Sequence, residues 1–446
     1  MKFVPNSDIK NEMLNELSLK KIDDLFSDVP KKIIIDELDL DEGLSQIQTE
    51  KKLREIASKN KSYSEVLCFL GGGIKPHYIP AAVKALAYRS EFFTAYTPYQ
   101  SEASQGFLQA MFEYQSMIAE LTGMDVANCS LYDGVTAVSE AALMSSRITR
   151  KKKFVIPANI SYDKKRVLKN YLKGPGIELV EVSYDDKTGK INLSDLEKIV
   201  NENTAGLYIE NPNFFGVFED EMDKIKKIAE ESKTLLVVGV DPVSLGIVKA
   251  PGEYGADIVI GEGRAFGNPM DFGGSSLGIF ACKKDYLRQM PGRIIGLTND
   301  SEGKRAFCMS MQTREQHIRR ARATSNICTN EGLCALTTCV YLSLLGGAGL
   351  QNLSKENFEK GQILSDMISS IDGFEKRFTG SHFNEFVIKS KKSAEKINEK
   401  LLKKNVQGGL LLKDQYPGLK HCMLFGVTEV HTEEDMSRLV KILEEV

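Results

Sequence analysis

The sequence predicts an α/β protein whose central sheet is mostly parallel and covered by helices on both faces. Short apolar segments alternate with helical segments between about residues 66 and 290, which is the order of a parallel sheet with crossover helices. Several of the short segments are apolar at nearly every position, such as the LLVVGV run at 235–240. Strands of this kind are buried on both faces. We therefore expect a large α/β domain over residues 66–330, preceded by a helical arm (1–65) and followed by a small α+β domain (331–446).

Composition limits the function as well as the fold. The chain has 446 residues, 42% of them hydrophobic and 27% charged, and this length predicts two or three domains. The formal net charge of −3 leaves no surplus of basic residues for phosphates, which argues against nucleic-acid binding. The eight cysteines lack CxxC spacing, so neither a zinc site nor a disulfide framework is expected. We see no apolar run of about 20 residues and no targeting segment, and we expect a cytoplasmic protein.

The first 65 residues predict an arm rather than a domain. Acidic and basic residues are interleaved, strand signals are few, and Ser27-Asp28-Val29-Pro30 marks a break between two helical pieces. Such an arm usually packs on a neighbouring chain, so we expect it to contact a partner.

Hydrophobic periodicity predicts the elements of the two following domains. In the large domain we expect helices at 107–121, 136–146, 164–171, 193–200 and 222–231, with strands at 153–156, 177–182, 206–210, 234–240, 257–260 and 277–281. A long helix at 331–345 leads into the small domain, where we expect helices at 358–371, 394–404 and 433–445 and strands at 385–388 and 421–427.

Two polar segments follow predicted strands and are candidates for ligand contacts. Asp241 ends the apolar run at 235–240, and ligands of open α/β sheets gather at the carboxyl ends of the strands. An aspartate here suits a carboxylate against the pyridine nitrogen of pyridoxal phosphate (PLP), or a simple Asp-Pro turn. Asn211–Gly216 has two side-chain amides and a glycine, which fit either ligand contacts or a rigid turn. The triple glycine at 71–73 lacks the lysine of a phosphate-binding loop.

Two further segments combine groups that suit a site or an interface. The segment at 92–106 contains Tyr96, Thr97, Pro98 and Tyr99 just before an amphipathic helix. The segment at 311–326 carries several arginines and ends in Thr324, Ser325 and Asn326. Arginine pairs well with phosphate or carboxylate, and hydroxyl and amide groups before a helix suit an anion. Salt bridges between subunits and ordinary helix packing remain alternatives.

The most informative loop is the one after the predicted strand 257–260. It lies where a large class of PLP enzymes carries its Schiff-base lysine, but it offers Arg264, and no lysine occurs from Pro251 to Cys282. A lysine can lose its proton and form an imine, whereas an arginine keeps its proton and cannot. If the fold is of this class, the chain cannot hold PLP covalently and another chain must complete the chemistry.

Taken together, these segments resemble the glycine cleavage system P-protein, glycine dehydrogenase (decarboxylating). The match is to the N-terminal half, which many bacteria make as a separate subunit 1 (alpha). The pieces that carry the resemblance run in order through the chain: 3–6, 24–30, 96–100 with 104–106, 132–134 with Thr136, 211–216, 251–257, 261–263 and 312–329.

The resemblance implies a fold-type I PLP-transferase architecture and a paired alpha–beta heterotetramer with the cofactor lysine on the beta subunit. It implies that glycine is decarboxylated with PLP as the electron sink and that the aminomethyl group passes to the lipoyl arm of the H-protein. Tyr96, Thr97, Pro98 and Tyr99 are then expected to be lent to the shared site. Thr324, Ser325 and Asn326 are expected to reach the cofactor phosphate held by the partner.

Two other functions stay open at this point. The chain could be a scaffold that stabilises beta and docks the H-protein without contacting substrate. It could also be an autonomous PLP enzyme that uses another lysine, such as Lys249. Two departures from the family concern the pocket: a family histidine near Asn159-Ile160-Ser161 is absent, and Arg264-Ala265-Phe266 differs from the usual loop.

Overall fold

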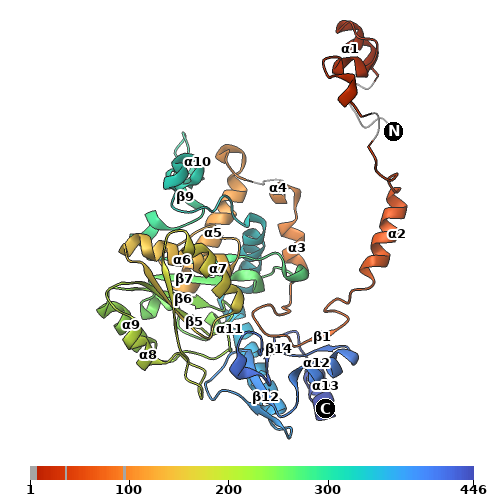
Figure 1. Cartoon of the computed structure of the whole chain (residues 1–446). Coiled ribbons are helices and arrows are strands. Elements are labelled where there is room, and N and C mark those ends of the chain that lie inside the picture. The colour runs from red at the N-terminus through yellow and green to blue at the C-terminus, as the bar shows by residue number, and fades with distance from the viewer. Residues whose placement is uncertain (1–7, 36–37, 94–96, 446) are drawn as a thin grey trace. The chain divides into compact units, whose positions relative to one another are not determined.

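The computed structural model describes residues 8–35, 38–93 and 97–445. The chain divides into two compact units, 1–61 and 62–446. The elements of both are labelled in Figure 1.

The N-terminal unit is helical, as predicted, and has almost no core. It contains α1 (Lys10–Glu16), α2 (Gln46–Ala57) and two short 3-10 turns at Ile22–Phe26 and Lys31–Ile33. The predicted break at 27–30 falls between these turns. Ser45 caps α2, where its hydroxyl accepts from the N–H of Gln48 in a reciprocal capping box. Among the described residues of this unit, only Leu14 is buried, so the arm does not stabilise itself through a hydrophobic centre.

The larger unit is built on a seven-stranded sheet in the order β2-β8-β7-β6-β5-β3-β4. Its strands are β2 (Val126–Ala127), β3 (Lys153–Pro157), β4 (Glu178–Val182), β5 (Thr204–Asn211), β6 (Leu235–Val240), β7 (Ile258–Glu262) and β8 (Gly278–Cys282). The pairs from β4 through β7 are parallel, and β8 is antiparallel to both of its neighbours. The predicted fold class, a mostly parallel sheet, is therefore confirmed.

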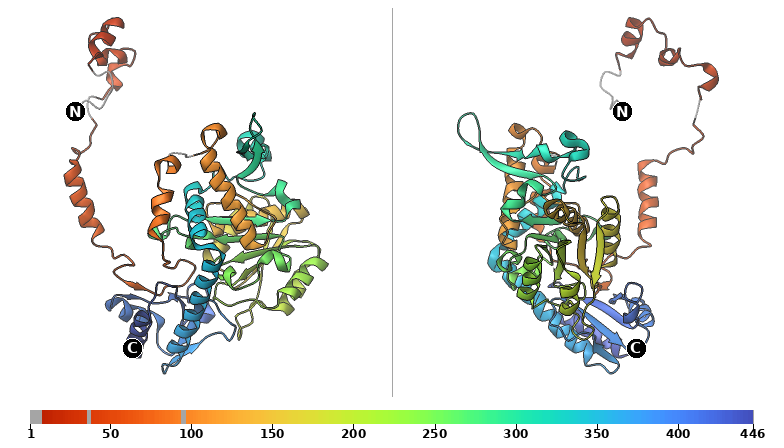
Figure 2. Two further views of the ribbon diagram at one scale, coloured as in Figure 1. Left: turned by 180° about the vertical axis from the view of Figure 1, so that it is seen from behind. Right: turned by 60° about the vertical axis from the view of Figure 1, so that its left-hand side comes forward.

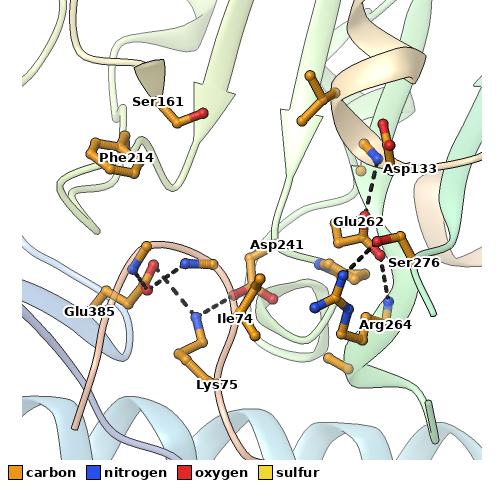
Figure 3. A pocket seen from close by; sticks show the side chains of 18 of the residues that line it. Ile74, Lys75, Asp133, Ser161, Phe214, Asp241, Glu262, Arg264, Ser276 and Glu385 are labelled. Atoms are coloured by element: carbon orange, nitrogen blue, oxygen red, sulfur yellow. Dashed lines mark hydrogen bonds and ion pairs between the residues drawn. The ribbon is translucent and has the colours of Figure 1, made fainter. Parts of the chain in front are cut away.

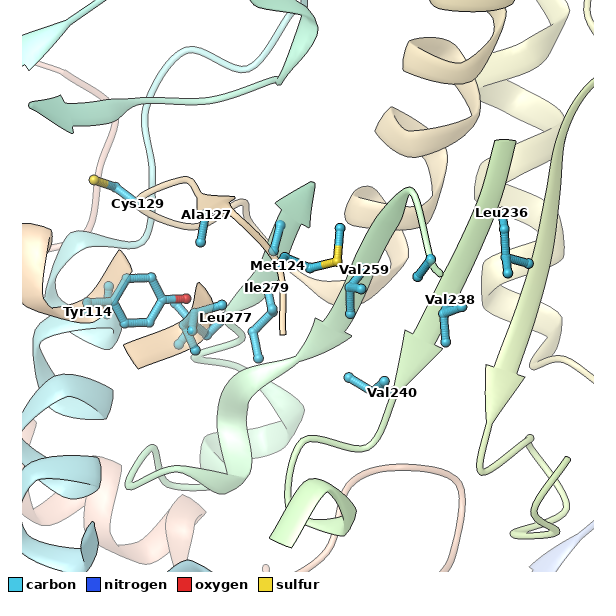
Figure 4. Close-up of a cluster of buried hydrophobic side chains, with 14 of the residues drawn as sticks. Tyr114, Met124, Ala127, Cys129, Leu236, Val238, Val240, Val259, Leu277 and Ile279 are labelled. Carbon is cyan, nitrogen blue, oxygen red and sulfur yellow. The ribbon is translucent and has the colours of Figure 1, made fainter. Parts of the chain in front are cut away.

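Helices cover both faces of this sheet, which explains the apolar strands. The covering helices are α5 (Gln105–Thr122), α6 (Gly134–Thr149), α7 (Tyr162–Lys173), α8 (Leu193–Ile199) and α9 (Met222–Glu231). Alternate strand positions point to opposite faces. Val238 and Val259 pack with residues of α5 (Figure 4), whereas Val237 and Ile260 pack with α6 and α7. Figures 1 and 2 show the sheet between these layers.

A second, antiparallel sheet forms the C-terminal part of the larger unit. Its order is β11-β12-β15-β14, from β11 (Phe374–Lys376), β12 (Glu385–Ser390), β14 (Leu410–Leu411) and β15 (Cys422–Gly426). It packs with α11 (Gly332–Ser369), α12 (Ala394–Lys403) and α13 (Glu433–Glu444) around one apolar cluster. The strands of the two sheets lie before residue 283 and after residue 373. The division into a large and a small domain at 330 stays a prediction, because residues 62–446 form one compact unit.

Some elements differ from the prediction. The two expected helices at 331–345 and 358–371 are one helix, α11, interrupted only at Gly346 (φ 61°, ψ 177°). A hairpin of β9 (Ile294–Asn299) and β10 (Arg305–Ser310) was not expected. The short helices α3 (Ala81–Ala87), α4 (Ser90–Phe93) and α10 (Gln316–Arg319) are also additional. In addition, β1 (Leu67–Cys68) pairs with β13 (Val406–Gln407), so the chain just after the arm packs on the C-terminal part.

One expectation about apolar runs was wrong. Helix α11 is long and apolar enough to cross a membrane, because residues 332–354 contain no charged side chain. Length and composition alone are weak support for a membrane span. The helix packs against α5 and α3 and buries Leu336, Tyr341 and Leu350, so its hydrophobicity is explained by core packing.

Candidate active site

A cavity of about 530 Å³ opens at the carboxyl ends of the central parallel strands. Three acidic lining residues come from these ends: Glu210 in β5, Asp241 directly after β6, and Glu262 at the end of β7. The glycine loop at 71–73 and Glu385 of β12 contribute other walls. Open α/β sheets bind ligands at this edge, so the cavity is the place to test for a cofactor.

Asp241, the predicted partner of a pyridine nitrogen, already has a cation beside it. The Nζ atom of Lys75 lies 3.2 Å from Asp241 Oδ2 and 3.5 Å from Glu385 Oε2. It also donates to Asn384 Oδ1 at 3.2 Å. Figure 3 shows Lys75 reaching between the two carboxylates. Burial alone would lower the pKa of Lys75, but Glu385 and Asp241 outweigh it and raise that pKa. Lys75 therefore stays charged and neutralises Asp241.

Arg264 lies in the turn after β7, at the position predicted for it. Its side chain is buried, and Nη2 donates to Ser276 Oγ at 2.5 Å (Figure 3). Its Nε and Nη1 have no hydrogen-bond partner among the described residues. Glu262 shapes the turn by accepting from the N–H groups of Arg264 at 3.1 Å and Leu277 at 2.8 Å. This arrangement fixes a permanent cation, which cannot form an imine, in the turn after β7.

The N-terminus of α6 borders the cavity, and two of its N–H groups, those of Gly134 and Thr136, are already bonded to acidic side chains. Asp133 caps the helix and accepts from the N–H of Thr136 at 2.5 Å. Glu262 accepts from the N–H of Gly134 at 3.1 Å. Free N–H groups at a helix N-terminus commonly bind phosphate. A phosphate that used the N–H groups of Gly134 and Thr136 would have to displace two acidic side chains.

The residues of this cavity therefore do not fit a covalently held PLP. Its two lysines are Lys75 and Lys164, and Lys164 is ion-paired with Glu210. The Glu210 carboxylate also accepts from the hydroxyl of Tyr208 at 2.7 Å. Lys249, the alternative lysine, is exposed and does not line the cavity. An imine needs a neutral amine that can attack the cofactor, and both cavity lysines are held by carboxylates.

The predicted aromatic segment lies apart from this cavity. Tyr96 is outside the described residues, and Thr97, Pro98 and Tyr99 do not line the cavity. Pro98 is buried, whereas Tyr99 is 59% exposed. The aromatic ring of Tyr99 is therefore presented on the surface of the described chain.

Arg293, which the sequence did not single out, anchors this segment. Its Nη2 donates to the hydroxyl of Tyr99 at 3.1 Å, and its guanidinium lies 5.4 Å from the centre of the Tyr99 ring. The same side chain donates to Thr329 Oγ1 at 3.0 Å and to the carbonyl of Cys328 at 3.2 Å. Arg293 is only 4% exposed. It thus joins the aromatic segment to the end of the arginine-rich segment.

The hydroxyl cluster before α11 also lies outside the cavity, and its members differ. The N–H of Thr324 donates to the carbonyl of Arg314 at 3.0 Å, while its hydroxyl has no partner in the described part of the chain. The hydroxyl of Ser325 accepts from the N–H of Ile327 at 3.0 Å. Burial raises the pKa of Glu140, and the Ser325 hydroxyl acts in the opposite direction. Asn326 is exposed. Thr324 and Asn326 are therefore available to a partner, whereas Ser325 also stabilises the local backbone.

Comparison with known proteins connects this geometry to a family. The family model described as the glycine cleavage system P-protein matches residues 1–443. A relative from Thermococcus onnurineus is 50% identical over 446 residues, covering 100% of this chain and 99% of its own length; it is named "Probable glycine dehydrogenase (decarboxylating) subunit 1". A relative of the same name from Desulforamulus reducens is 45% identical, with 98% of both chains covered.

The chain belongs to the glycine cleavage system P-protein family.

Solved structures agree with this membership. The crystal structure of glycine decarboxylase (P-protein) in inhibitor-bound form matches with a TM-score of 0.91 and 38% identity, covering 100% of both chains. Sphingosine-1-phosphate lyase from Burkholderia pseudomallei matches with a TM-score of 0.67 at 15% identity, covering 92% of both chains, and at this identity it supports the fold alone. The predicted family and the fold-type I class are confirmed.

Within this P-protein fold, Asn211–Gly216 forms a structural turn. The Oδ1 atom of Asn213 accepts from the N–H groups of Phe215 at 3.0 Å and Val217 at 3.3 Å. Gly216 has φ +81°, and a Cβ there would lie 1.9 Å from the carbonyl oxygen of Glu385. Only glycine permits this close approach. The rigid-turn alternative is therefore supported, although Pro212, Asn213 and Phe214 also line the cavity.

The sequence missed three features of this P-protein site: the Lys75 ion pairs, the Glu262 bonds and the Arg293 anchor. Each links segments that are far apart in the chain, and no local pattern marks such pairs. His317, the one histidine in a candidate motif, is half exposed and lies 3.6 Å from Glu315. Among the described residues, no group of three potential ligands could hold a metal ion.

Proposed function

We propose that this chain is the alpha subunit of a glycine decarboxylase and that it completes a site whose PLP is held by a beta subunit. Family membership and full-length relatives named subunit 1 support the decarboxylase assignment. One observation supports the assignment of PLP to the beta subunit: the charged groups of this chain's own cavity are already paired with each other. Lys75 neutralises Asp241, acidic groups occupy the start of α6, and Arg264 replaces the amine.

The residues proposed to be lent lie elsewhere on the chain. Thr97, Pro98, Tyr99 and the cluster at 324–326 do not line this chain's own cavity. Arg293 holds the two segments together and leaves Tyr99 exposed. Such an arrangement suits a site formed across a subunit interface. Tyr96 belongs to the same proposal on the grounds of sequence alone.

The partners follow from the family. We propose a heterotetramer with the beta subunit, transfer of the aminomethyl group to the lipoyl arm of the H-protein, and a cytoplasmic location. On the partner chain, PLP supplies an electron sink for the carbanion left by loss of carbon dioxide. This chain supplies side chains that position and enclose the site. The uncovered apolar residues of the arm, such as Leu25, Phe26 and Ile35, suit burial against that partner.

Reconstitution tests the proposal. Each subunit is purified separately, and glycine–bicarbonate exchange is measured for this chain, for the beta subunit and for their mixture, each with added PLP. We expect no exchange and no imine absorbance from this chain alone, and full exchange from the mixture. Imine absorbance and exchange from this chain alone would instead support an autonomous enzyme.

Substitution of Thr324 tests the contact with the partner's cofactor. In the assembled enzyme, Thr324→Val should weaken PLP binding about 10-fold, because a hydrogen bond to a charged acceptor contributes about 1.5–3 kcal/mol. Ser343→Ala is the control and should leave PLP affinity unchanged, because that hydroxyl lies in α11, outside the 324–326 cluster, and donates to the carbonyl of Cys339 at 2.7 Å. Fluorescence titration of the apoenzyme with PLP measures both. Equal affinities for wild type and Thr324→Val would contradict the contact.

A scaffold function is the second candidate, and the exposed arm favours it. A scaffold predicts that Tyr99→Ala leaves turnover unchanged once the complex has formed. The shared site predicts a clear loss of turnover in the same preformed complex.

A further inference from the structure

A second depression on the surface of the 62–446 unit is lined by arginines. Its volume is about 390 Å³, and all of its charged lining residues are arginines: Arg147, Arg288, Arg314, Arg319 and Arg322. We call this surface the arginine groove. Arg147 is on α6, Arg319 ends α10, and the others are on the short 3-10 turns at 284–289, 312–314 and 320–322. Figures 1 and 2 show α10 beside the β9–β10 hairpin at one end of this unit.

These positive charges are not balanced by the chain. In the described part of the chain, none of the five arginines forms an ion pair within 4.0 Å. Three of them donate hydrogen bonds to backbone carbonyls: Arg147 to Gln289, Arg314 to Gly292 and Arg319 to Thr313, each at 3.0 Å. Carbonyls fix the orientation of a guanidinium but leave its charge in place.

The basic character is local. The chain as a whole has a formal net charge of −3, so a face with five arginines and no acidic lining residue differs sharply from the average surface. The two nearby carboxyl groups, Glu140 and Glu315, act on Arg147 and Arg314 only through longer-range attraction. Such a patch steers and orients an oppositely charged partner.

The chemistry of arginine specifies the partner further. Its planar fork matches a carboxylate with two parallel hydrogen bonds, and arginine is enriched in protein–protein interfaces. The guanidiniums surround a depression of about 390 Å³. At its edge, the backbone N–H of Thr324 already donates to the carbonyl of Arg314. A tight site for a small anion would use a free backbone N–H, and this one is not free. An acidic protein segment fits better.

Thr324 connects this surface to the shared site, because it also lines the arginine groove. We propose that the arginine groove docks a carboxylate-rich segment of the beta subunit and thereby sets the register of Thr324 at the partner's cofactor. This proposal rests on the proposed function, and it adds the surface and the chemistry of the contact. Arg288, Arg319 and Arg322 are the exposed members of the groove, and Arg319 and Arg322, which lie close together in the chain, are used for the test.

Charge reversal tests the arginine groove. The variant Arg319→Glu/Arg322→Glu is compared with Lys224→Glu/Lys227→Glu, which changes two exposed residues of α9 by the same total charge. Affinity for the purified beta subunit is measured by calorimetry at about 0.05 and about 0.5 M salt, where screening differs strongly. We expect the first variant to bind at least about 100-fold more weakly at low salt and to lose most of the salt dependence. The control should bind like wild type.

Each outcome decides the matter. If the first variant keeps wild-type affinity and a wild-type circular dichroism spectrum, the arginine groove is not the docking surface, although the proposed function stands. If wild-type chain and beta subunit do not associate, both proposals fail. The isolated chain is also titrated with inorganic phosphate. Stoichiometric binding that the reversal abolishes would make the arginine groove a small-anion site and overturn the docking proposal.

Discussion

Replacing Lys75 with methionine should lower the free energy of unfolding of residues 62–446 by about 3–5 kcal/mol, because breaking a buried ion pair leaves an uncompensated charge. Lys75 is 6% exposed and contacts Asp241 and Glu385 at 3.2 and 3.5 Å. Methionine has a similar length but no charge, so both carboxylates would lose their cation. Urea unfolding followed by circular dichroism measures the difference.

The pH of this measurement follows from the direction of the pKa shift. The two carboxylates raise the pKa of Lys75 above its ordinary 10.5. A raised amine pKa contributes stability that is fully present below the unfolded value and is lost only as the pH rises through the folded value. Measurements near neutral pH therefore include the whole effect. Wild type should lose this contribution only in strong alkali, and the Lys75→Met variant should lack that loss.

A surface ion pair provides the control. Lys283 lies 2.6 Å from Asp257, and its side chain is 43% exposed, so Lys283→Met should change stability much less. A Lys75→Met variant as stable as wild type would show that the two carboxylates are held in another way. A drop equal to that of Lys283→Met would point to the same conclusion.

Replacing Arg293 with methionine should lower the glycine decarboxylation rate of the assembled enzyme about 100-fold, since a misplacement of about 1 Å at a site can cost that much. Arg293 holds Tyr99, Cys328 and Thr329 through three hydrogen bonds of 3.0–3.2 Å. Methionine cannot donate to any of them. The segments at 97–99 and 324–330 would then lose their common anchor.

Two variants make this result specific. Arg293→Lys keeps the charge but not the planar fork, so it should recover only part of the rate. Arg438→Met removes a surface arginine that donates to the carbonyl of Lys404 at 2.8 Å, and it should leave the rate unchanged. Size-exclusion chromatography confirms that each complex forms. A wild-type rate in the Arg293→Met complex would contradict the anchoring role.

The regular part of the fold could be predicted because it depends on local pattern. Helix α9 was predicted with its observed bounds, Met222–Glu231, since its apolar residues recur at helical spacing. The buried strand Leu235–Val240 was predicted to within one residue. In such segments the period of the side chains and their burial agree, so tertiary contacts do not override the pattern.

Helix and strand bounds were predicted less well where contacts between residues far apart in the sequence determine them. We expected two separate helices at 331–345 and 358–371, and glycines at 346, 347 and 349 lie between them. Packing of Leu350, Ser354 and Asn357 nevertheless keeps α11 helical beyond the local interruption. The hairpin of β9 and β10 lacks a clear alternation of polar and apolar residues in its exposed half, so its strands were missed.

The residues of the candidate site also fall into two groups, those that a local pattern could place and those that depend on distant contacts. Arg264 and Asp241 could be placed because each follows a recognisable strand. Lys75 could not, because it lies 166 positions before Asp241 in a loop without periodicity. The proximity of Ser325 to the buried Glu140 of α6 was also hidden, because the two residues are far apart in the sequence.

The N-terminal arm has a consequence for the relative amounts in which the two subunits are synthesised. Its side chains at Ile33, Ile35, Leu38 and Leu40 are 64–77% exposed. An alpha chain without its proposed beta partner would therefore expose an apolar surface to other proteins. Unassembled subunits with exposed apolar surface commonly aggregate or are degraded by proteases. Balanced synthesis of the two chains would then be a requirement set by the exposed apolar side chains of this segment.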